Sequence, residues 1–227
     1  MAVASPSMQE RFQRIATGHV ADALEHLGVR TPMLRGGFRP LTNTTRMAGP
    51  AVTLEVCRSR FGTESRRLTE FLDETVDQGT VLVIDAQRIN DTVLFGDRAG
   101  LRARMRGAVG AVINGYVRDI DGLETLEFPV HALGAGIPAS EGKLQGVRLN
   151  EDLVVNGILV QPGDWMVADP TGVCVVPRGI VSEVLELAEE RDATDKESLV
   201  ELRAGKTARD THRHFKSDNA DSIRSLE

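Results

Sequence analysis

Apolar residues near the start of the chain recur at helical spacing. The pattern predicts one or two helices before Gly28, a residue typical of the position just after a helix. Ser7 and Glu10 have the spacing of a capping box in front of the first helix. The residues that set the helical spacing are Phe12, Ile15, Val20, Leu24 and Leu27.

The middle of the chain alternates between short apolar runs and amphipathic segments. Residues 29–42 are rich in Pro and Gly and are predicted to be a loop. Strand, helix and strand in alternation favour a parallel sheet, which we expect to hold residues 81–133. The pattern predicts strands at 47–57, 80–86, 108–115 and 129–136, and helices at 65–79 and 97–106.

The second half of the chain has a different pattern. Residues 145–177 contain alternating or apolar runs separated by NE, NG, PGD and DPTG turns, which predicts several short strands. The residues after 177 begin as a helix and become increasingly polar. We therefore predict one α/β domain over residues 1–190, a three-layer sandwich with N-terminal helices and a β-rich second half. A polar helical extension or tail should follow over residues 191–227.

The composition is that of a globular protein and narrows the possible functions. Of the 227 residues, 41% are apolar and 26% charged, and the net charge of −6 disfavours nucleic acid as a ligand. No apolar stretch approaches the length of a membrane helix, about 18 residues, and the N-terminus lacks the apolar core of a signal peptide. Cys57 and Cys174 form no CxxC motif, so we expect them to be reduced in a cytoplasmic protein.

Two charged motifs follow neighbouring predicted elements. Gly96 and Asp97 stand where the 97–106 helix begins, and the free amides and dipole there favour a bound carboxylate. Arg118 and Asp119 come just after the next strand. If the two strands are neighbours, both loops open into one crevice, where Arg118 suits a carboxylate or enolate oxygen and Asp119 a hard divalent cation. The alternative is structural: Asp97 caps the helix and Arg118 pairs with Asp119 in a turn.

The sequence around these motifs resembles the RraA-like family. Asp97 is followed, after twenty intervening residues, by Arg118 and Asp119 in the segment GAVINGYVRD. Other similar segments occur in the family's order over about residues 15–185: HVADALEHLG, GPAVTLEV, VLVIDA, FPVHALG and VQPGDWMVADPTGVCVVP. The family includes the 4-hydroxy-4-methyl-2-oxoglutarate / 4-carboxy-4-hydroxy-2-oxoadipate aldolases. The resemblance therefore implies the RraA-like, swivelling β/α type of sandwich.

The resemblance also implies a role for each residue of the two motifs. The segment from Gly96 to Ala99 would bind substrate through its backbone amides, and Arg118 would grip the pyruvate part. Asp119 would ligate the metal ion, and Asp97 would bind substrate and hold a water that relays protons. The implied assembly is a homotrimer or homohexamer with the active site at the subunit interface.

The implied activity is the divalent-metal-dependent cleavage of a 4-hydroxy-2-oxo acid, which releases pyruvate. Mg²⁺ is the expected cation, with Mn²⁺ or Co²⁺ as alternatives, and oxaloacetate decarboxylation is expected as a side activity. No lysine stands in the motif, which disfavours a Schiff-base aldolase. Arg98 and Ala99 stand where the aldolases often carry Leu, Asn or Ile, so the 2-oxo acid that is accepted would differ.

A non-catalytic function remains as the alternative. The branch that gives the family its name resembles the aldolases but inhibits an RNA-degrading endonuclease by protein contact. That branch replaces the Asp of the Arg-Asp pair, whereas this chain keeps Asp119. The retained metal ligand favours an enzyme over a protein-binding regulator of ribonuclease activity.

Other motifs carry weaker signals. Residues 133–139, LGAGIPA, match a dinucleotide-binding glycine pattern, but their proline interrupts any helix start. His212 and His214 stand in the polar tail, where solvated side chains are expected. We expect His131 to be a structural histidine and Asp169 to form a turn.

Overall fold

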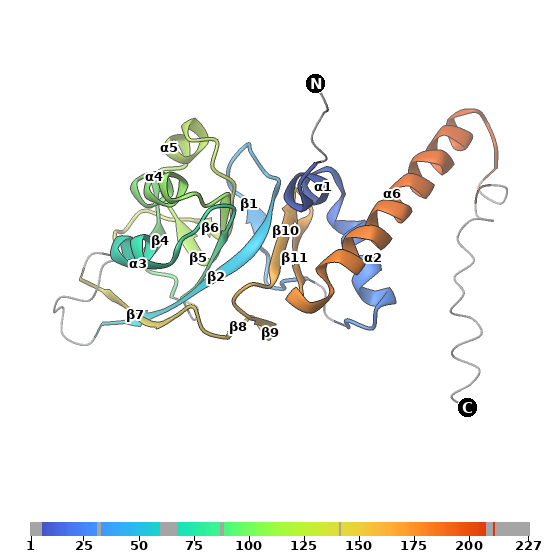
Figure 1. The fold of residues 1–227 in the computed structure, drawn as a ribbon. Helices are drawn as coiled ribbons and strands as arrows, with labels where there is room; N and C mark the ends of the chain where they lie inside the picture. The colour runs from blue at the N-terminus through green and yellow to red at the C-terminus, as the bar shows by residue number, and fades with distance from the viewer. Residues whose placement is uncertain are drawn as a thin grey trace, which may run out of the picture.

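A computed structural model gives the fold of the chain (Figure 1). It describes residues 6–30, 33–59, 68–86, 89–140, 142–207 and 211. The helices of this part are α1 (Met8–Arg14), α2 (Thr17–His26), α3 (Leu68–Thr75), α4 (Asp97–Arg106), α5 (Ile120–Thr125), the short 3₁₀ turn η1 (Arg178–Ile180) and α6 (Val181–Arg203). Its strands are β1 (Arg39–Pro40), β2 (Met47–Arg58), β3 (Val81–Asp85), β4 (Val93–Phe95), β5 (Gly110–Val117), β6 (Val130–Ala135), β7 (Leu144–Leu149), β8 (Leu153–Val155), β9 (Ile158–Val160), β10 (Trp165–Asp169) and β11 (Gly172–Val176).

A mixed sheet forms the centre of the fold. Its strands follow the order β1-β6-β5-β3-β2-β10-β11, with β4 paired to β5 and β7 paired to β2. Strands β2, β3, β5 and β6 are parallel neighbours, whereas β7 and β10 run antiparallel to β2. β8 and β9 form a separate hairpin. The long strand β2 therefore joins the parallel half of the sheet to the antiparallel half.

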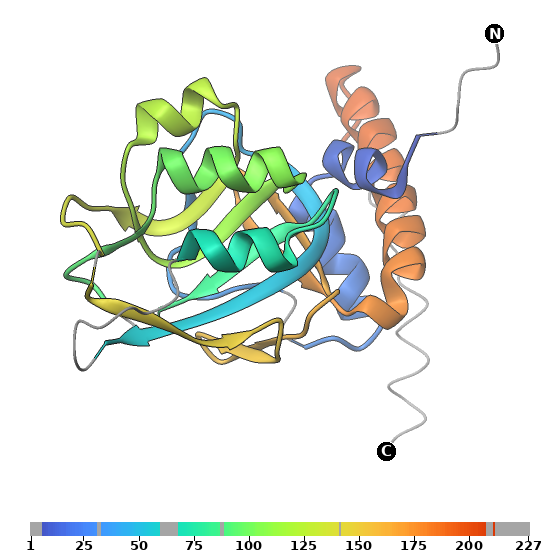
Figure 2. The ribbon, with the colours of Figure 1, turned by 60° about the vertical axis from the view of Figure 1, so that its left-hand side comes forward.

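Two apolar clusters lie on opposite faces of the parallel strands. Ile84 and Ile113 belong to the cluster under α3, α4 and α5, which cover one face of the sheet (Figure 2). The preceding residues Val83 and Val112 belong to the second cluster, which includes the apolar side of the β8–β9 hairpin. Successive side chains of a strand point to opposite faces, so each buried strand contributes to both clusters. The continuous apolar runs in the sequence reflect this burial on both sides.

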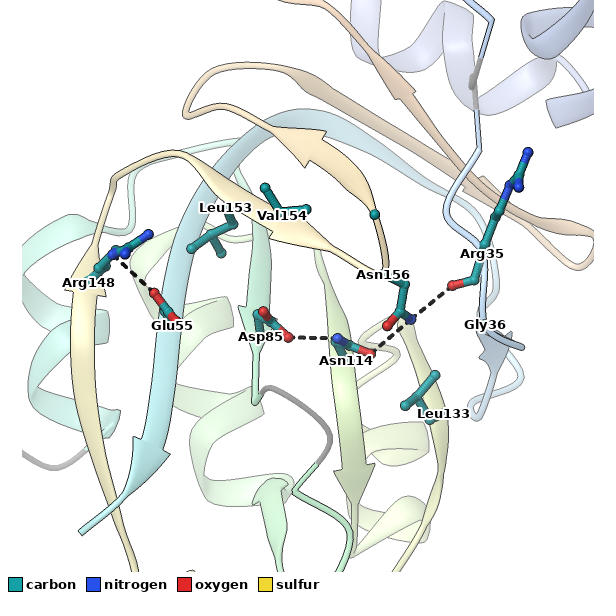
Figure 3. A pocket seen from close by; sticks show the side chains of 11 residues that line it. Arg35, Gly36, Glu55, Asp85, Asn114, Leu133, Arg148, Leu153, Val154 and Asn156 are labelled. Atoms are coloured by element: carbon teal, nitrogen blue, oxygen red, sulfur yellow. Dashed lines mark hydrogen bonds and ion pairs between the residues drawn. The ribbon is translucent and has the colours of Figure 1, made fainter. Parts of the chain in front are cut away.

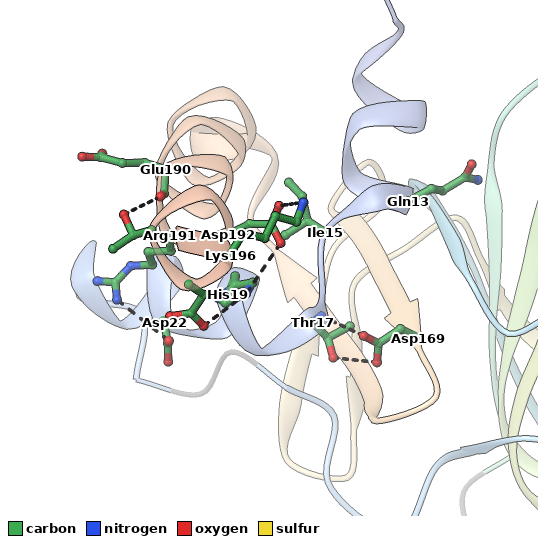
Figure 4. A network of polar contacts seen from close by, with 12 residues as sticks. Gln13, Ile15, Thr17, His19, Asp22, Asp169, Glu190, Arg191, Asp192 and Lys196 are labelled. Atoms are coloured by element: carbon green, nitrogen blue, oxygen red, sulfur yellow. Dashed lines mark hydrogen bonds and ion pairs between the residues drawn. The ribbon is translucent and has the colours of Figure 1, made fainter. Parts of the chain in front are cut away.

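Helices α1, α2 and α6 pack against β10 and β11 and form a third apolar cluster. Asp169, at the end of β10, accepts hydrogen bonds from the backbone N–H of Thr17 at 2.9 Å and from its hydroxyl at 2.8 Å, which secures the start of α2 (Figure 4). His19 lies 3.8 Å from Asp192 and 3.6 Å from Asp195, so polar contacts also join α2 to α6. No helix in the described ranges has the length and apolar character that crossing a membrane requires.

The structure confirms the predicted α/β sandwich of the RraA-like type. The capping box of Ser7 and Glu10 is present, and α4 has the predicted bounds. Strands β1 and β4 and helix α5 were not predicted, because two to six residues carry too little periodicity. The parallel part also begins earlier than expected, at β2. The helix predicted over 65–79 ends at Thr75, and its first residues lie outside the described ranges, as does most of the tail.

Candidate functional site

The two charged motifs begin where β4 and β5 end. These strands are parallel and Phe95 pairs with Val117, so Gly96 and Arg118 are the next residues at the same edge of the sheet. The backbone N–H of Arg118 donates to the carbonyl oxygen of Phe95 at 3.0 Å, which holds the two chain segments side by side. Both loops therefore open beyond the carboxyl ends of neighbouring parallel strands, the usual place for a ligand in such a sheet.

Each strand leads directly into a helix. Gly96 is the N-cap of α4, and Asp97 is its first residue; Oδ1 of Asp97 accepts a hydrogen bond from the backbone N–H of Arg98 at 2.6 Å. Asp119 is the N-cap of α5 and has the left-handed conformation, with φ of 55° and ψ of 44°. Few residues other than glycine adopt this conformation, and Asp is among those that tolerate it. The backbone at Asp119 is therefore constrained by the turn from β5 into α5.

Two glycines allow the starts of α4 and α5 to lie against each other. A Cβ atom at Gly96 would lie 2.7 Å from Oδ2 of Asp119, and a Cβ atom at Gly122 would lie 2.6 Å from Cβ of Asp97. Both distances are shorter than side-chain contacts allow. Cβ of Asp97 is fixed to its backbone, so Gly122 depends on the absence of a side chain, whereas at Gly96 the carboxylate of Asp119 would have to rotate away. Gly122 is not among the predicted site residues; its place three residues after Asp119 is the signal in the sequence that marks it.

Arg118 and Asp119 form an ion pair that solvent reaches. Nε of Arg118 lies 3.2 Å from Oδ2 of Asp119, and the two side chains are 41% and 42% exposed. An exposed pair of this kind contributes only about 0–1 kcal/mol to stability. Both side chains are therefore accessible to a small molecule, and folding gives little reason for their presence.

The remaining residues of the two motifs differ in what they can offer. Ala99 is buried, so only its backbone can face a ligand, whereas the side chain of Arg98 is exposed beside Asp97. Among the described residues, no group of three or more His, Cys, Asp or Glu side chains is arranged to hold a metal ion. A cation at this edge would thus take most of its ligands from water and from the bound molecule, as Mg²⁺ commonly does.

The weaker motifs are structural where the chain is described. His131 is fully buried, and its Nε2 lies 2.8 Å from the carbonyl oxygen of Thr45; burial lowers the pKa of its imidazole. Asp169 joins β10 to α2 and also accepts from the backbone N–H of Thr171 at 2.8 Å, the turn contact that was expected. Residues 136–140, after β6, form no helix, so the glycine pattern lacks its phosphate-binding helix. His212 and His214 lie outside the described residues.

The sequence and this geometry define the class of protein. The chain belongs to the RraA-like family, whose model, described as Aldolase/RraA, matches residues 17–175. A protein of Halalkalibacterium halodurans named "Putative 4-hydroxy-4-methyl-2-oxoglutarate aldolase" is 31% identical over 187 residues, which are 82% of this chain and 84% of that relative. Protein DlpA of Legionella pneumophila is 29% identical over 198 residues, which are 83% of this chain and only 31% of DlpA.

A solved structure extends the comparison to the family's other branch. Streptomyces coelicolor RraAS2 is described as an unusual member of the RNase ES inhibitor RraA protein family. It superposes with a TM-score of 0.74 at 28% sequence identity, over 87% of this chain and 98% of RraAS2. The fold is therefore common to relatives named for aldol chemistry and relatives named for ribonuclease inhibition, so the choice between these functions depends on the site.

Proposed function

We propose that the protein is a divalent-metal-dependent aldolase that cleaves a 4-hydroxy-2-oxo acid and releases pyruvate. The observation that carries the proposal is the meeting of Asp97, Arg118 and Asp119 at the edge where β4 and β5 end. The name of the Halalkalibacterium halodurans relative supports the same reaction class.

The residues present fit a hard divalent cation such as Mg²⁺, with Mn²⁺ or Co²⁺ as alternatives. The carboxylate of Asp119 is 42% exposed, and Gly96 leaves open the space beside it that a Cβ atom would fill. One carboxylate with waters and substrate oxygens is a common ligand set for Mg²⁺. Asp119 would hold the ion, and a bound ion supplies Lewis-acid stabilisation for negative charge on the keto oxygen of the substrate.

The other site residues bind and orient the substrate and move its protons. The guanidinium of Arg118 would pair with the 2-oxo acid end, since it is planar and permanently charged. The backbone amides from Gly96 to Ala99, other than that of Arg98, which already donates to Oδ1 of Asp97, would donate hydrogen bonds to the carboxylate. Asp97 would hold the water that takes the proton from the C4 hydroxyl as the C3–C4 bond breaks. The electron pair of that bond then forms the enolate of pyruvate, which is protonated at C3.

The same enolate forms when oxaloacetate loses carbon dioxide, so we propose oxaloacetate decarboxylation as a side activity. We also propose that the protein works as a homotrimer or homohexamer in which a neighbouring subunit borders the site. Each side chain of the Arg118–Asp119 pair is about two-fifths exposed in the single chain, so a neighbouring subunit has room to exclude water there.

The second candidate is a protein-binding regulator of ribonuclease activity. Its support is the fold shared with RraAS2 over 98% of that chain. Retention of Asp119 favours the enzyme, because its exposed carboxylate stands where β5 ends and could ligate a divalent cation.

The deciding experiment measures pyruvate release from a panel of 4-hydroxy-2-oxo acids by the purified full-length protein, with Mg²⁺ and with a chelator. We expect metal-dependent release that falls at least about 100-fold in Asp119→Asn, since a metal ligand is lost. Asp121→Asn is the matched control, because Asp121 is an exposed carboxylate only two residues away, in the first turn of α5. A folded wild type that releases no pyruvate from any acid of the panel would instead favour the regulator.

A further inference from the structure

A row of polar side chains crosses the parallel sheet on the face opposite α3, α4 and α5. In the strand register, Arg148 on β7 lies opposite Glu55 on β2. Glu55 lies opposite Asp85 on β3, and Asp85 lies opposite Asn114 on β5. The four residues therefore lie at one level across four neighbouring strands (Figure 3). Glu55 and Asp85 are each 6% exposed and Asn114 is 3% exposed, so three of the four are buried.

Hydrogen bonds and an ion pair hold the row in place. Nε of Arg148 lies 3.2 Å from Oε2 of Glu55, and Nδ2 of Asn114 donates to Oδ1 of Asp85 at 2.6 Å. Asn156, in the turn between β8 and β9, donates from its Nδ2 to Oδ1 of Asn114 at 3.2 Å. The tip of the hairpin is thus attached to the sheet through the same row (Figure 3).

Folding alone does not account for this row. Glu55 and Asp85 are directly opposite each other on neighbouring strands, where like charges repel. Apolar residues in place of buried ionic groups are often neutral or stabilising. Val83 and Val112, two positions earlier on β3 and β5, belong to the apolar cluster of this same face, so aliphatic side chains fit it well. A buried polar row on an otherwise apolar face is expected where it serves binding.

The row lines a cavity of about 840 Å³, within the usual range for small-molecule sites. Leu133 on β6 and Leu153 on β8 add apolar surface to its lining. Arg148 stands at the open side, since its side chain is 53% exposed. The cavity lining does not include the residues of the proposed aldolase site, which are Gly96 to Ala99, Arg118 and Asp119, so the cavity is distinct from that site.

We propose that this cavity is a second ligand site, and that it binds a free α-amino acid as its zwitterion. The ammonium group would lie against the carboxylates of Asp85 and Glu55, and the carboxylate would meet the guanidinium of Arg148. Nε of Arg148 lies 3.2 Å from Oε2 of Glu55, and Asp85 is on the next strand, about 4.8 Å further along the row, so opposite charges lie as close together as the two charged groups of an α-amino acid require. An aliphatic side chain would then lie on Leu153 of β8. A simple cation would be repelled by Arg148, and a simple anion would be repelled by the two carboxylates, so a ligand that carries both charges fits the cavity best.

The test is calorimetric titration of the full-length protein with L-leucine and with two analogues that each lack one charge, isoamylamine and 4-methylpentanoate. We expect saturable binding of L-leucine, and binding about ten-fold weaker or worse for either analogue. Arg148→Gln should weaken L-leucine binding about ten-fold, because it removes a charge-assisted contact. Arg58→Gln is the matched control: it breaks an exposed ion pair with Asp91, and Arg58 also lies on the β2–β7 pair but outside the cavity lining.

Asp85→Asn tests the ammonium end, with circular dichroism to establish that the variant is folded; if it does not fold, Arg148→Gln decides, since that side chain is half exposed. Three results would overturn the proposal. They are no binding of L-leucine or of a panel of other α-amino acids, equal affinity for either single-charge analogue, and unchanged affinity in folded Arg148→Gln. None of these readouts depends on aldolase activity, so the test of this site is independent of the test of the proposed function.

Discussion

Gly122→Ala tests whether the close approach of α4 and α5 sets the geometry of the site. The added Cβ atom would lie 2.6 Å from Cβ of Asp97, whereas ordinary contact begins at 3.4 Å, so the two must separate by about 0.8 Å. Cβ of Asp97 is fixed to the backbone and cannot rotate away, unlike the end of a long side chain. The start of α4 must therefore shift, and Asp97 shifts with it.

In Gly122→Ala, the expected loss of stability is small and the expected loss of activity is large, so the two effects can be measured separately. Overpacking costs typically about 1–3 kcal/mol, and replacement of Gly by Ala within a helix returns about 1 kcal/mol. Gly122 lies within α5 and has no positive φ, so alanine is compatible with its backbone. We expect a loss of at most about 2 kcal/mol in the free energy of unfolding. Misplacement of a catalytic group by 1 Å can lower the rate about 100-fold, so we expect kcat/KM for pyruvate release to fall by that order.

The assay combines urea denaturation with steady-state pyruvate release. Gly18→Ala is the control, because Gly18 lies in α2 and a Cβ atom there would have nothing within 4 Å. The control should keep full activity and gain slightly in stability. A folded Gly122→Ala variant with wild-type kcat/KM in an active protein would refute the reasoning, since it would mean that the position of Asp97 does not matter.

Two further predictions concern stability and reactivity. Asp169→Ala should lower the free energy of unfolding by about 2–4 kcal/mol, because it leaves the buried donors of Thr17 without an acceptor. Burial acts to raise the pKa of Asp169, but hydrogen bonds from Thr17 and Thr171 outweigh it and lower the pKa below 3.8. The stabilisation is therefore complete above that value and lost at lower pH, so urea titrations of wild type and variant should converge as the solution is acidified. Burial raises the pKa of Cys174 to about 12, so at pH 8 iodoacetamide should label half-buried Cys57 and leave Cys174 intact in the folded protein; equal labelling would contradict this.

The strongest sequence predictions came from patterns that are local in the chain. The capping box, the bounds of α4 and the buried strands β3 and β5 follow from spacing within a few residues, and the structure has all of them. The short elements β4 and α5 were missed, although they bring the two charged motifs together. Their few residues form those elements because neighbouring strands and helices hold them, which no local pattern records.

The polar row across the sheet also could not be predicted from local sequence patterns. Asp85 and Asn114 stand inside or at the end of apolar runs, and a charged or amide residue in a buried strand is a signal visible in the sequence. Only the strand register, however, places Asp85 opposite both Glu55 and Asn114 and puts Arg148 at the end of the row. The sequence alone could not predict that these residues lie opposite one another, because they belong to four separate strands.

The sequence by itself determined the longer helices and strands and the family that the chain resembles, because periodicity and motif order are properties of neighbouring residues. The tertiary structure alone decided that Asp97 lies against Gly122, that Asp119 lies against Gly96, and that a separate cavity forms beneath the β8–β9 hairpin. The physical reason is that the pairing of strands and the contact of helices depend on residues far apart in the chain, whose side chains meet only once the sheet has formed.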